Sequence, residues 1–241
     1  MRSIEQRFRE AVESELARHP DRHAEYHRDF AAGRYREGLK ALEYLQGRYP
    51  DAFRARPKIL DVGGGNGGFL LPFAERAQFR CFWIDHQRSD VLEQVIRQAD
   101  TRVSRVVGDA GALSFASASI DVVLCIETIE HVNARALGQE IARVLRPGGI
   151  CYLTTPSRFR FLLRRDPHYG IPGLLLLPDG VQRAVFHWLR PGEPYEVEHL
   201  FWSVYGIMSA LPGLRLAEVT SSNWAGPLRR FDWDWVVAQK R

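Results

Sequence analysis

The chain has 241 residues, which at about 150 residues per domain corresponds to one domain, or to one domain with an elaboration. Hydrophobic residues make up 45% and charged residues 26%, so general disorder and fibrous repeats are excluded. The sequence has no run of 18 apolar residues, no apolar stretch typical of a secretory signal, and only three cysteines. We therefore expect a cytoplasmic protein without a transmembrane segment or a disulfide framework.

The net charge is small, because Lys and Arg exceed Asp and Glu by 33 − 29 = 4. A nucleic-acid-binding module usually concentrates its basic charge on one face. Here the one local excess comprises Arg158, Arg160, Arg164 and Arg165. We interpret these arginines as a solvated surface, and nucleic acid is not the expected partner.

The first 57 residues have helical periodicity. Ser3 and Gln6 have the spacing of a capping box, in which each side chain bonds to the backbone N–H of the other. Ile4, Phe8 and Val12 then form an apolar stripe at helical spacing. We expect residues 1–57 to form a helical segment that packs on a core formed by residues 58–241.

From Lys58 onward, short apolar runs alternate with amphipathic stretches. The strands are expected at 59–62, 80–85, 103–107, 120–126, 150–155, 214–221 and 231–238, and the helices at 66–77, 88–99, 134–145 and 203–211. This alternation predicts an α/β fold of the Rossmann-like, doubly wound type, in which a mostly parallel sheet carries helices on both faces.

Residues 156–200 interrupt this rhythm with six prolines, several aromatic residues and a run of four leucines. The segment is too long for an ordinary loop, so we expect a lid insertion that helps to bind a substrate. Within it, His168 and Tyr169 follow a turn-forming Asp-Pro pair. We name these two residues as candidate substrate-binding residues.

A glycine-rich turn and two further acidic residues follow three successive strands. Gly63, Gly65 and Gly67 come directly after Asp61, at the expected junction of a strand and a helix. Such a turn lets the backbone approach a ligand closely, and the helix N-terminus offers free N–H groups. Asp85 ends the second strand and Asp109-Ala110 follow the third. Ligands in open α/β sheets bind at these carboxyl ends, so the turn and both acids predict a nucleoside-type cofactor site.

The sequence resembles the class I S-adenosylmethionine-dependent methyltransferases. The matching stretches are KILDVGGGNGGF from Lys58, Asp85, Gly108-Asp109-Ala110, IDVVLCIETIEHV from Ile120 and ARVLRPGGICYLTTP from Ala142. The resemblance implies a seven-stranded sheet with one antiparallel strand near its end, and S-adenosylmethionine as cofactor. It also implies that Gly63 and Gly65 contact the methionine part, with Gly67 in the same loop. Asp85 is expected to bind the ribose, Asp109 and Ala110 the adenine, and Asp61 to order the loop or reach the amino group.

The segment Glu127-Thr128-Ile129-Glu130-His131 follows the fourth strand. If a helical turn begins there, Glu127, Glu130 and His131 share one face and have the residue types that bind a divalent metal such as Mg²⁺ or Mn²⁺. The spacing resembles that of the ubiquinone-pathway O-methyltransferases and of the small-RNA 2′-O-methyltransferases, and His199 would supply a further ligand in the latter. The alternative is a metal-free pocket in which Glu127 and His131 are catalytic and His131 acts as the base.

The sequence lacks the Asn/Asp-Pro-Pro-Tyr motif of base N-methyltransferases, because Cys125-Ile126-Glu127-Thr128 stands in its place. We therefore expect O-methylation of a small-molecule, sugar or lipid-linked acceptor, with His168, Tyr169 and His199 as substrate-binding residues. Two alternatives remain open. One is an RNA 2′-O-methyltransferase with a metal-assisted Glu-x-x-Glu-His site, and the other is a cofactor-binding protein without catalytic activity.

Overall fold

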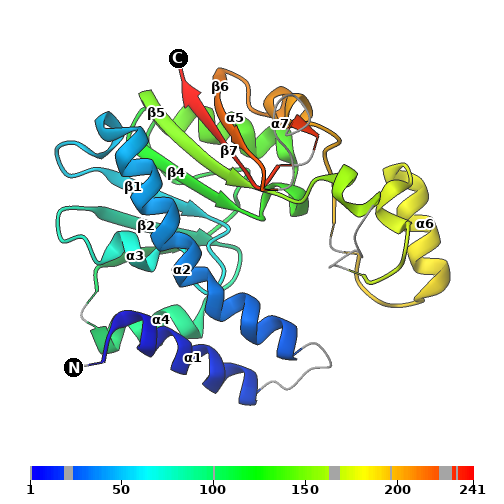
Figure 1. Cartoon of the computed structure of the whole chain (residues 1–241), viewed down its shortest axis with the longest axis horizontal. Helices are drawn as coiled ribbons and strands as arrows, with labels where there is room; N and C mark the ends of the chain where they lie inside the picture. The colour runs from blue at the N-terminus through cyan, green and yellow to red at the C-terminus, as the bar shows by residue number, and fades with distance from the viewer. Residues whose placement is uncertain are drawn as a thin grey trace. The chain divides into compact units, whose positions relative to one another are not determined.

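The computed structural model describes residues 2–18, 24–99, 101–162, 169–195, 197–222, 230–231 and 233–241 (Figure 1). The chain divides into two compact units. The first unit contains residues 1–109 and 119–124, and the second contains residues 110–118 and 125–241. In the part of the chain that the structure describes, no helix has the length and apolar character needed to cross a membrane.

The first unit contains the N-terminal helices and the strands that follow them. Its elements are α1 (Ile4–Arg18), α2 (Ala24–Arg48), η1 (Pro50–Phe53), β1 (Lys58–Val62), α3 (Leu71–Ala74), β2 (Arg80–Asp85), α4 (Asp90–Ala99), β3 (Val103–Val107) and most of β4 (Ile120–Ile126). β1 pairs with β2 and β2 with β3, both in parallel, so that Val62 faces Ile84 and Asp85 faces Val107. The register places the carboxyl ends of these three strands side by side.

The capping box predicted at the start of the chain is confirmed. The N–H of Ser3 donates to the Gln6 side chain at 3.0 Å, and the N–H of Gln6 donates to the Ser3 hydroxyl at 3.2 Å. Phe8 and Val12 of the predicted stripe are buried, and α1 lies beside α2 and α4 (Figure 1). The stripe explains this arrangement, since an amphipathic helix is stable when its apolar face is covered.

The predicted helix at 66–77 is much shorter in the structure. Only Leu71–Ala74 are helical, and turns occupy the residues between the glycine loop and this helix. Gly67 has φ of +77°, a left-handed conformation that interrupts helical geometry. Pro72 stands in the first turn of α3, where its missing N–H costs nothing. The glycines therefore prolong the loop at the expense of the helix.

The second unit contains the remaining elements. They are η2 (Ile129–His131), α5 (Ala134–Val144), β5 (Leu145–Thr154), η3 (Arg158–Leu162), η4 (Leu174–Leu176), α6 (Asp179–Leu189), α7 (Val204–Ala210), β6 (Leu214–Thr220) and β7 (Trp235–Lys240). β7 runs antiparallel to both β5 and β6. Along the sheet the strand order is β3-β2-β1-β4-β5-β7-β6, which confirms the seven-stranded, mostly parallel sheet with one antiparallel strand near its end.

Residues 156–200 have a small hydrophobic core of their own, which includes Tyr169, Leu174, Phe186 and Leu200. α6, drawn in yellow in Figure 1, supplies Phe186 to this core. The segment 157–158 is tied to the chain before α7, because the N–H of Arg158 donates to the carbonyl of Phe201 at 2.9 Å. The insertion is therefore a packed substructure within its unit.

Candidate functional site

The glycine loop bends back over the end of β2. The N–H groups of Gly63 and Gly64 both donate to the carbonyl of Ile84, at 2.8 and 3.2 Å. Gly63, Gly65 and Gly67 have φ values of +68°, +49° and +77°. Only glycine adopts such conformations without strain, which is the physical reason for three glycines at alternate positions.

Gly64 was not among the predicted cofactor residues, yet it makes the closest approach in the loop. A Cβ atom at this position would lie 2.3 Å from Cδ1 of Trp83 and 2.9 Å from Oδ2 of Asp61. No real side chain fits at these distances. The middle glycine of the Gly63-Gly64-Gly65 triple is the sequence signal for this contact, but the bulky partner on β2 appears only in the fold.

Asp61 lies beneath the loop and is almost completely buried, at 1% exposure. Neither of its carboxylate oxygens has a hydrogen-bond partner among the described residues. Burial, and after it the negative charge of Asp85, raises the pKa of the Asp61 carboxyl to about 7, although Arg34 on α2 acts to lower this pKa. A buried, unpaired carboxylate is costly, and a cation placed next to it relieves that cost.

Asp85 ends β2 and ties the loop to the strand. Its Oδ2 accepts a hydrogen bond from the N–H of Gly65 at 2.9 Å, and its Oδ1 accepts from the N–H of Gln87 at 3.1 Å. Its backbone carbonyl accepts from Gly108 at 2.9 Å, which holds the end of β3 beside it. Asp109 is exposed directly after Gly108. The first unit therefore brings Asp61, Asp85 and Asp109 to three neighbouring strand ends, while half-buried Ala110 begins the second unit.

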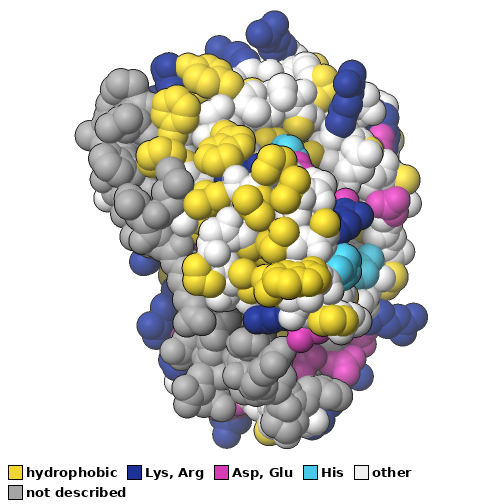
Figure 2. Space-filling model, turned by 90° about the vertical axis from the view of Figure 1, so that its right-hand side faces the viewer, with side chains coloured by type: hydrophobic (Ala, Val, Ile, Leu, Met, Phe, Trp, Pro, Cys, Tyr) yellow, Lys and Arg dark blue, Asp and Glu magenta, His cyan; other side chains and the backbone are white. Residues whose placement is uncertain are grey.

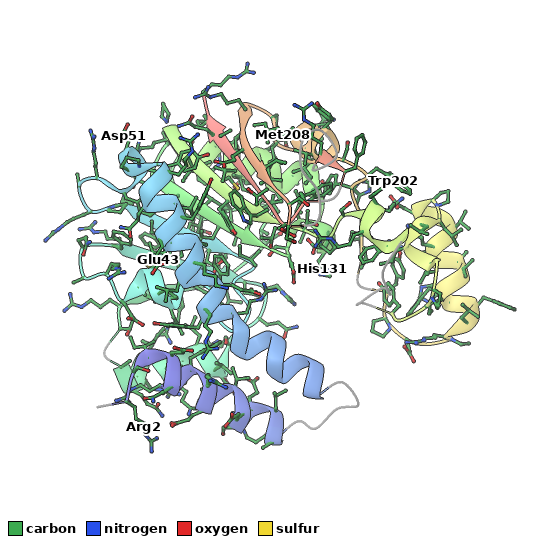
Figure 3. The ribbon with its side chains drawn as sticks, viewed as in Figure 1. Arg2, Glu43, Asp51, His131, Trp202 and Met208 are labelled. Carbon is green, nitrogen blue, oxygen red and sulfur yellow. The ribbon has the colours of Figure 1, made fainter. Side chains whose placement is uncertain are left out.

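The turn after β4 belongs to the second unit. Glu127 has φ of +50°, a left-handed conformation that is rare and strained for a residue with a side chain. Its N–H donates to the carbonyl of Thr154 at 2.9 Å. The N–H of His131 donates to the backbone carbonyl of Thr128 at 3.0 Å, and residues 129–131 form a short 3-10 helix. Figure 3 shows His131 on this turn, where it is half-buried.

Glu130 connects this turn to the segment that carries His199. The Glu130 side chain is fully buried, and its backbone carbonyl accepts hydrogen bonds from the N–H groups of Glu198 and His199, at 2.7 and 3.1 Å. The imidazole of His199 instead bonds through Nδ1 to Oδ2 of Asp179, at 2.8 Å. The backbone of His199 is thus held close to the turn, and its side chain pairs with Asp179.

The arrangement corrects the predicted metal site. Among the described residues, which include Glu127, Glu130, His131 and His199, no group of three or more metal-ligating side chains is placed to hold an ion. The 3-10 geometry of residues 129–131 replaces the helical turn that would have aligned Glu127, Glu130 and His131 on one face. Nδ1 of His199 bonds to Asp179, which is not one of the predicted ligands.

Of the two substrate-binding residues predicted within the lid, His168 lies outside the described residues. Tyr169 is 7% exposed, its ring stacks on Tyr195 at 5.1 Å between centroids, and its hydroxyl accepts a hydrogen bond from the N–H of Val197 at 2.9 Å. Tyr169 therefore serves the core of the insertion, in place of the acceptor contact expected from the sequence.

Known proteins resemble this chain in both sequence and fold. A family model described as a methyltransferase domain matches residues 60–153. An uncharacterized methyltransferase of Mycobacteroides abscessus is 36% identical over 193 residues, which cover 78% of this chain and 71% of the relative. The chain spans only 24% and 37% of the lengths of two other curated relatives that it matches.

Two solved structures share the fold. The PH0226 protein from Pyrococcus horikoshii OT3 matches with a TM-score of 0.61 and 21% identity, over 86% of this chain and 91% of that one. Geranyl diphosphate C-methyltransferase from Streptomyces coelicolor matches with a TM-score of 0.54 and 15% identity, over 83% and 76%. The latter structure contains Mg²⁺, geranyl-S-thiolodiphosphate and S-adenosyl-L-homocysteine. At these identities the two likenesses show the fold alone.

Proposed function

The chain belongs to the S-adenosylmethionine-dependent methyltransferases, and on that premise we propose that it methylates a hydroxyl group of a small-molecule acceptor. The observation that supports the cofactor in this proposal is the buried carboxylate of Asp61 beneath the glycine loop. S-adenosylmethionine carries an ammonium group, and an ammonium is the type of partner that this carboxylate lacks.

The residues of the first unit fit the rest of the cofactor. The φ values of Gly63, Gly65 and Gly67 form a backbone cradle, and the space at the Cβ position of Gly65 is open. Oδ2 of Asp85 accepts one hydrogen bond, from the N–H of Gly65, and retains a lone pair for a ribose hydroxyl, whereas Oδ1 already contacts the N–H of Gln87 and Nδ1 of His86. Asp109, with Ala110, is assigned to the adenine. The bound cofactor supplies an electrophilic methyl group, and the protein mainly supplies positioning.

The second unit supplies the groups that act on the acceptor. An alcohol is a poor nucleophile while it is protonated, so a base must accept its proton. We assign this role to His131, whose half-buried side chain lies on the turn after β4. Glu127 is assigned to orienting the acceptor hydroxyl, since a strained conformation is retained at functional positions. The absence of the Asn/Asp-Pro-Pro-Tyr motif agrees with an oxygen acceptor.

Radiolabelled methyl transfer tests the proposal. The purified protein is incubated with methyl-labelled S-adenosylmethionine and either a small-molecule cell extract or an RNA fraction, and products are identified by mass spectrometry. We expect label in a methyl ether of a small molecule, with or without a chelator. Label in RNA, transfer that a chelator abolishes, or cofactor binding without transfer would each contradict the proposal, and the last would favour a non-catalytic protein.

Variants then test the base. His131→Ala is expected to lower turnover by about a hundredfold or more, because the base that accepts the proton of the acceptor hydroxyl is removed. Affinity for S-adenosylhomocysteine should stay unchanged. The matched control is His187→Ala, which removes an exposed histidine of α6 in the same unit. Unchanged turnover in both His131→Ala and Glu127→Gln would remove these residues from the proposed chemistry.

A further inference from the structure

A groove in the second unit lies outside the residues assigned to catalysis. It has a volume of about 460 Å³. Residues of η3, of η4 and of the start of α6 form one side of it, and the segment 199–206 forms the other. Its walls are mostly apolar and include Leu176, Leu200, Phe201 and Trp202. Its polar side chains include Arg158, Asp179 and His199. A mostly apolar cavity with a few converging polar groups is the usual form of a small-molecule site.

Asp179 joins the polar side chains into one cluster. Its Oδ1 accepts a hydrogen bond from the Arg158 guanidinium, and its Oδ2 bonds to Nδ1 of His199 at 2.8 Å. Burial acts to raise the pKa of the Asp179 carboxyl, but the hydrogen bonds from Arg158 and His199 outweigh it and hold this pKa below its ordinary value. Asp179 is therefore ionised at neutral pH and acts only as an acceptor.

This charge fixes the tautomer of His199. Because an ionised carboxylate only accepts, Nδ1 of the imidazole must carry the proton that joins it to Asp179. In the neutral ring Nε2 then has a lone pair for a hydrogen bond from a ligand. The side chain is 46% exposed, and the ring of Phe201 lies edge-on to it at 4.8 Å. The backbone bond from His199 to Glu130 places this acceptor next to the turn that carries His131.

Trp202 and Arg158 form the aromatic part of the groove. The Trp202 side chain is 47% exposed, and the Arg158 guanidinium lies 5.3 Å from the centre of its ring. The Arg158 side chain is 5% exposed, and its Nε has no hydrogen-bond partner among the described residues. Figure 2 shows hydrophobic side chains gathered on the face that includes α6, with histidine side chains beside them. A flat apolar ring gains most by stacking on such a wall.

We infer that this groove binds an aromatic ring of the methyl acceptor, and that a hydroxyl on this ring donates a hydrogen bond to Nε2 of His199. This anchoring hydroxyl is distinct from the hydroxyl whose proton His131 accepts. The inference rests on the proposed function and narrows its acceptor class. A sugar presents hydroxyls on most of its carbons, and several of them would be buried unpaired against Leu176, Leu200 and Phe201. An aromatic ring with one hydroxyl in the groove buries its apolar faces against these walls and needs one polar partner there. Asp179 is a positioning residue in this site, because it acts through His199.

The test compares two probes that differ at the hydroxyl, whose hydrogen is replaced by a methyl group in the second probe. 2-Naphthol carries the hydroxyl donor, and 2-methoxynaphthalene has the same ring without it. Ligand-observed NMR titrations measure both affinities in the presence of S-adenosylhomocysteine. We expect 2-naphthol to bind about tenfold more tightly, the effect of one hydrogen bond of about 1.4 kcal/mol. His199→Phe keeps an aromatic ring but removes Nε2, which accepts the hydrogen bond. Asp179→Ala removes the carboxylate that fixes the tautomer and orientation of His199. Both variants should bind the two probes equally.

The matched control is Glu198→Gln. Glu198 neighbours His199 and pairs with Arg183 of α6 at 3.3 Å, but it does not belong to the groove wall. This variant should keep the tenfold preference. Equal binding of the two probes to the wild-type protein, or a preference that survives in His199→Phe, would overturn the inference. Binding of S-adenosylhomocysteine, measured in the same samples, separates this outcome from a failure of the proposed function.

Discussion

The backbone N–H of Gly65 donates a hydrogen bond to Oδ2 of Asp85 at 2.9 Å. One carboxylate thereby fixes the conformation of the glycine loop and remains 11% exposed at the end of β2. The same side chain is thus responsible for the shape of the loop and for the proposed contact with the ribose. Because of these two roles, we expect a substitution of Asp85 to have a larger effect than that of a surface carboxylate.

Asp85→Ala is expected to weaken binding of S-adenosylhomocysteine by about tenfold to a hundredfold, because hydrogen bonds to a charged group contribute about 1.5–3 kcal/mol. Isothermal titration calorimetry measures the affinity. Asp51→Ala is the control, since Asp51 is an exposed carboxylate of η1 in the same unit (Figure 3). Wild-type affinity in Asp85→Ala would show that the ribose is bound elsewhere.

Gly64→Ala is expected to disrupt the loop. The added Cβ would lie 2.3 Å from Trp83 and 2.9 Å from Asp61, so the backbone must move away from both. We expect a loss of stability of about 2–4 kcal/mol and a loss of cofactor binding. Thermal unfolding is the measurement. Gly47→Ala in α2 meets no atom within 4 Å and should be neutral or stabilising. Equal melting temperatures for the two variants would refute the close approach.

Asp61→Asn is expected to change how stability depends on pH. The pKa of Asp61 is raised from 3.8 to about 7 in the folded protein, so the fold favours its protonated form. The stabilisation of the fold by protonated Asp61 is fully present below the pKa of the unfolded chain, and it is lost as the pH rises through 7. The wild type should therefore lose up to about 4 kcal/mol relative to Asp61→Asn between pH 4 and pH 8. Urea titrations across this range measure the difference, and parallel curves would contradict the assignment.

S-adenosylhomocysteine should reverse this effect in the wild type. Its ammonium pairs with the ionised Asp61, so the ligand should raise the melting temperature of the wild type at pH 8 more than that of Asp61→Asn. Equal shifts would place the ammonium away from Asp61.

Tyr169→Phe is expected to destabilise the insertion. Its hydroxyl accepts the hydrogen bond of the Val197 N–H, and the loss leaves a buried donor unpaired at a cost of about 1–3 kcal/mol. Chemical denaturation measures this cost. Tyr205→Phe, in α7 of the same unit, removes a hydroxyl that accepts a hydrogen bond from Arg230 on the exposed surface, and it should have little effect. Affinity for S-adenosylhomocysteine should stay unchanged in both, and a weakened affinity in Tyr169→Phe would argue against a purely structural role.

The sequence alone determined the sheet and the positions of the acids. The apolar run Ile120–Ile126 coincides with an observed strand, because a strand buried on both faces is apolar along nearly its whole length. Val103–Val107 also coincides with a strand, although most of its residues are not buried. The positions of Asp61, Asp85 and Asp109 could also be predicted from the strands. Once the strands are known to be parallel, their carboxyl ends lie at one edge, and residues that follow each strand become neighbours.

Only the tertiary structure decided the local geometry and the partners of the side chains. The helix that was expected after the glycines covers only Leu71–Ala74. The left-handed conformations of the glycines and the position of Pro72 prevent an earlier start, despite the apolar periodicity of the segment. Asp179 and His199 are 20 residues apart, and no spacing rule relates two side chains across an irregular insertion. The sequence predicts Tyr169 as a substrate-binding residue, whereas the fold buries it in the core of the insertion. The periodicity of a sequence predicts the secondary structure of each segment, whereas a binding site depends on which segments are in contact in the tertiary structure.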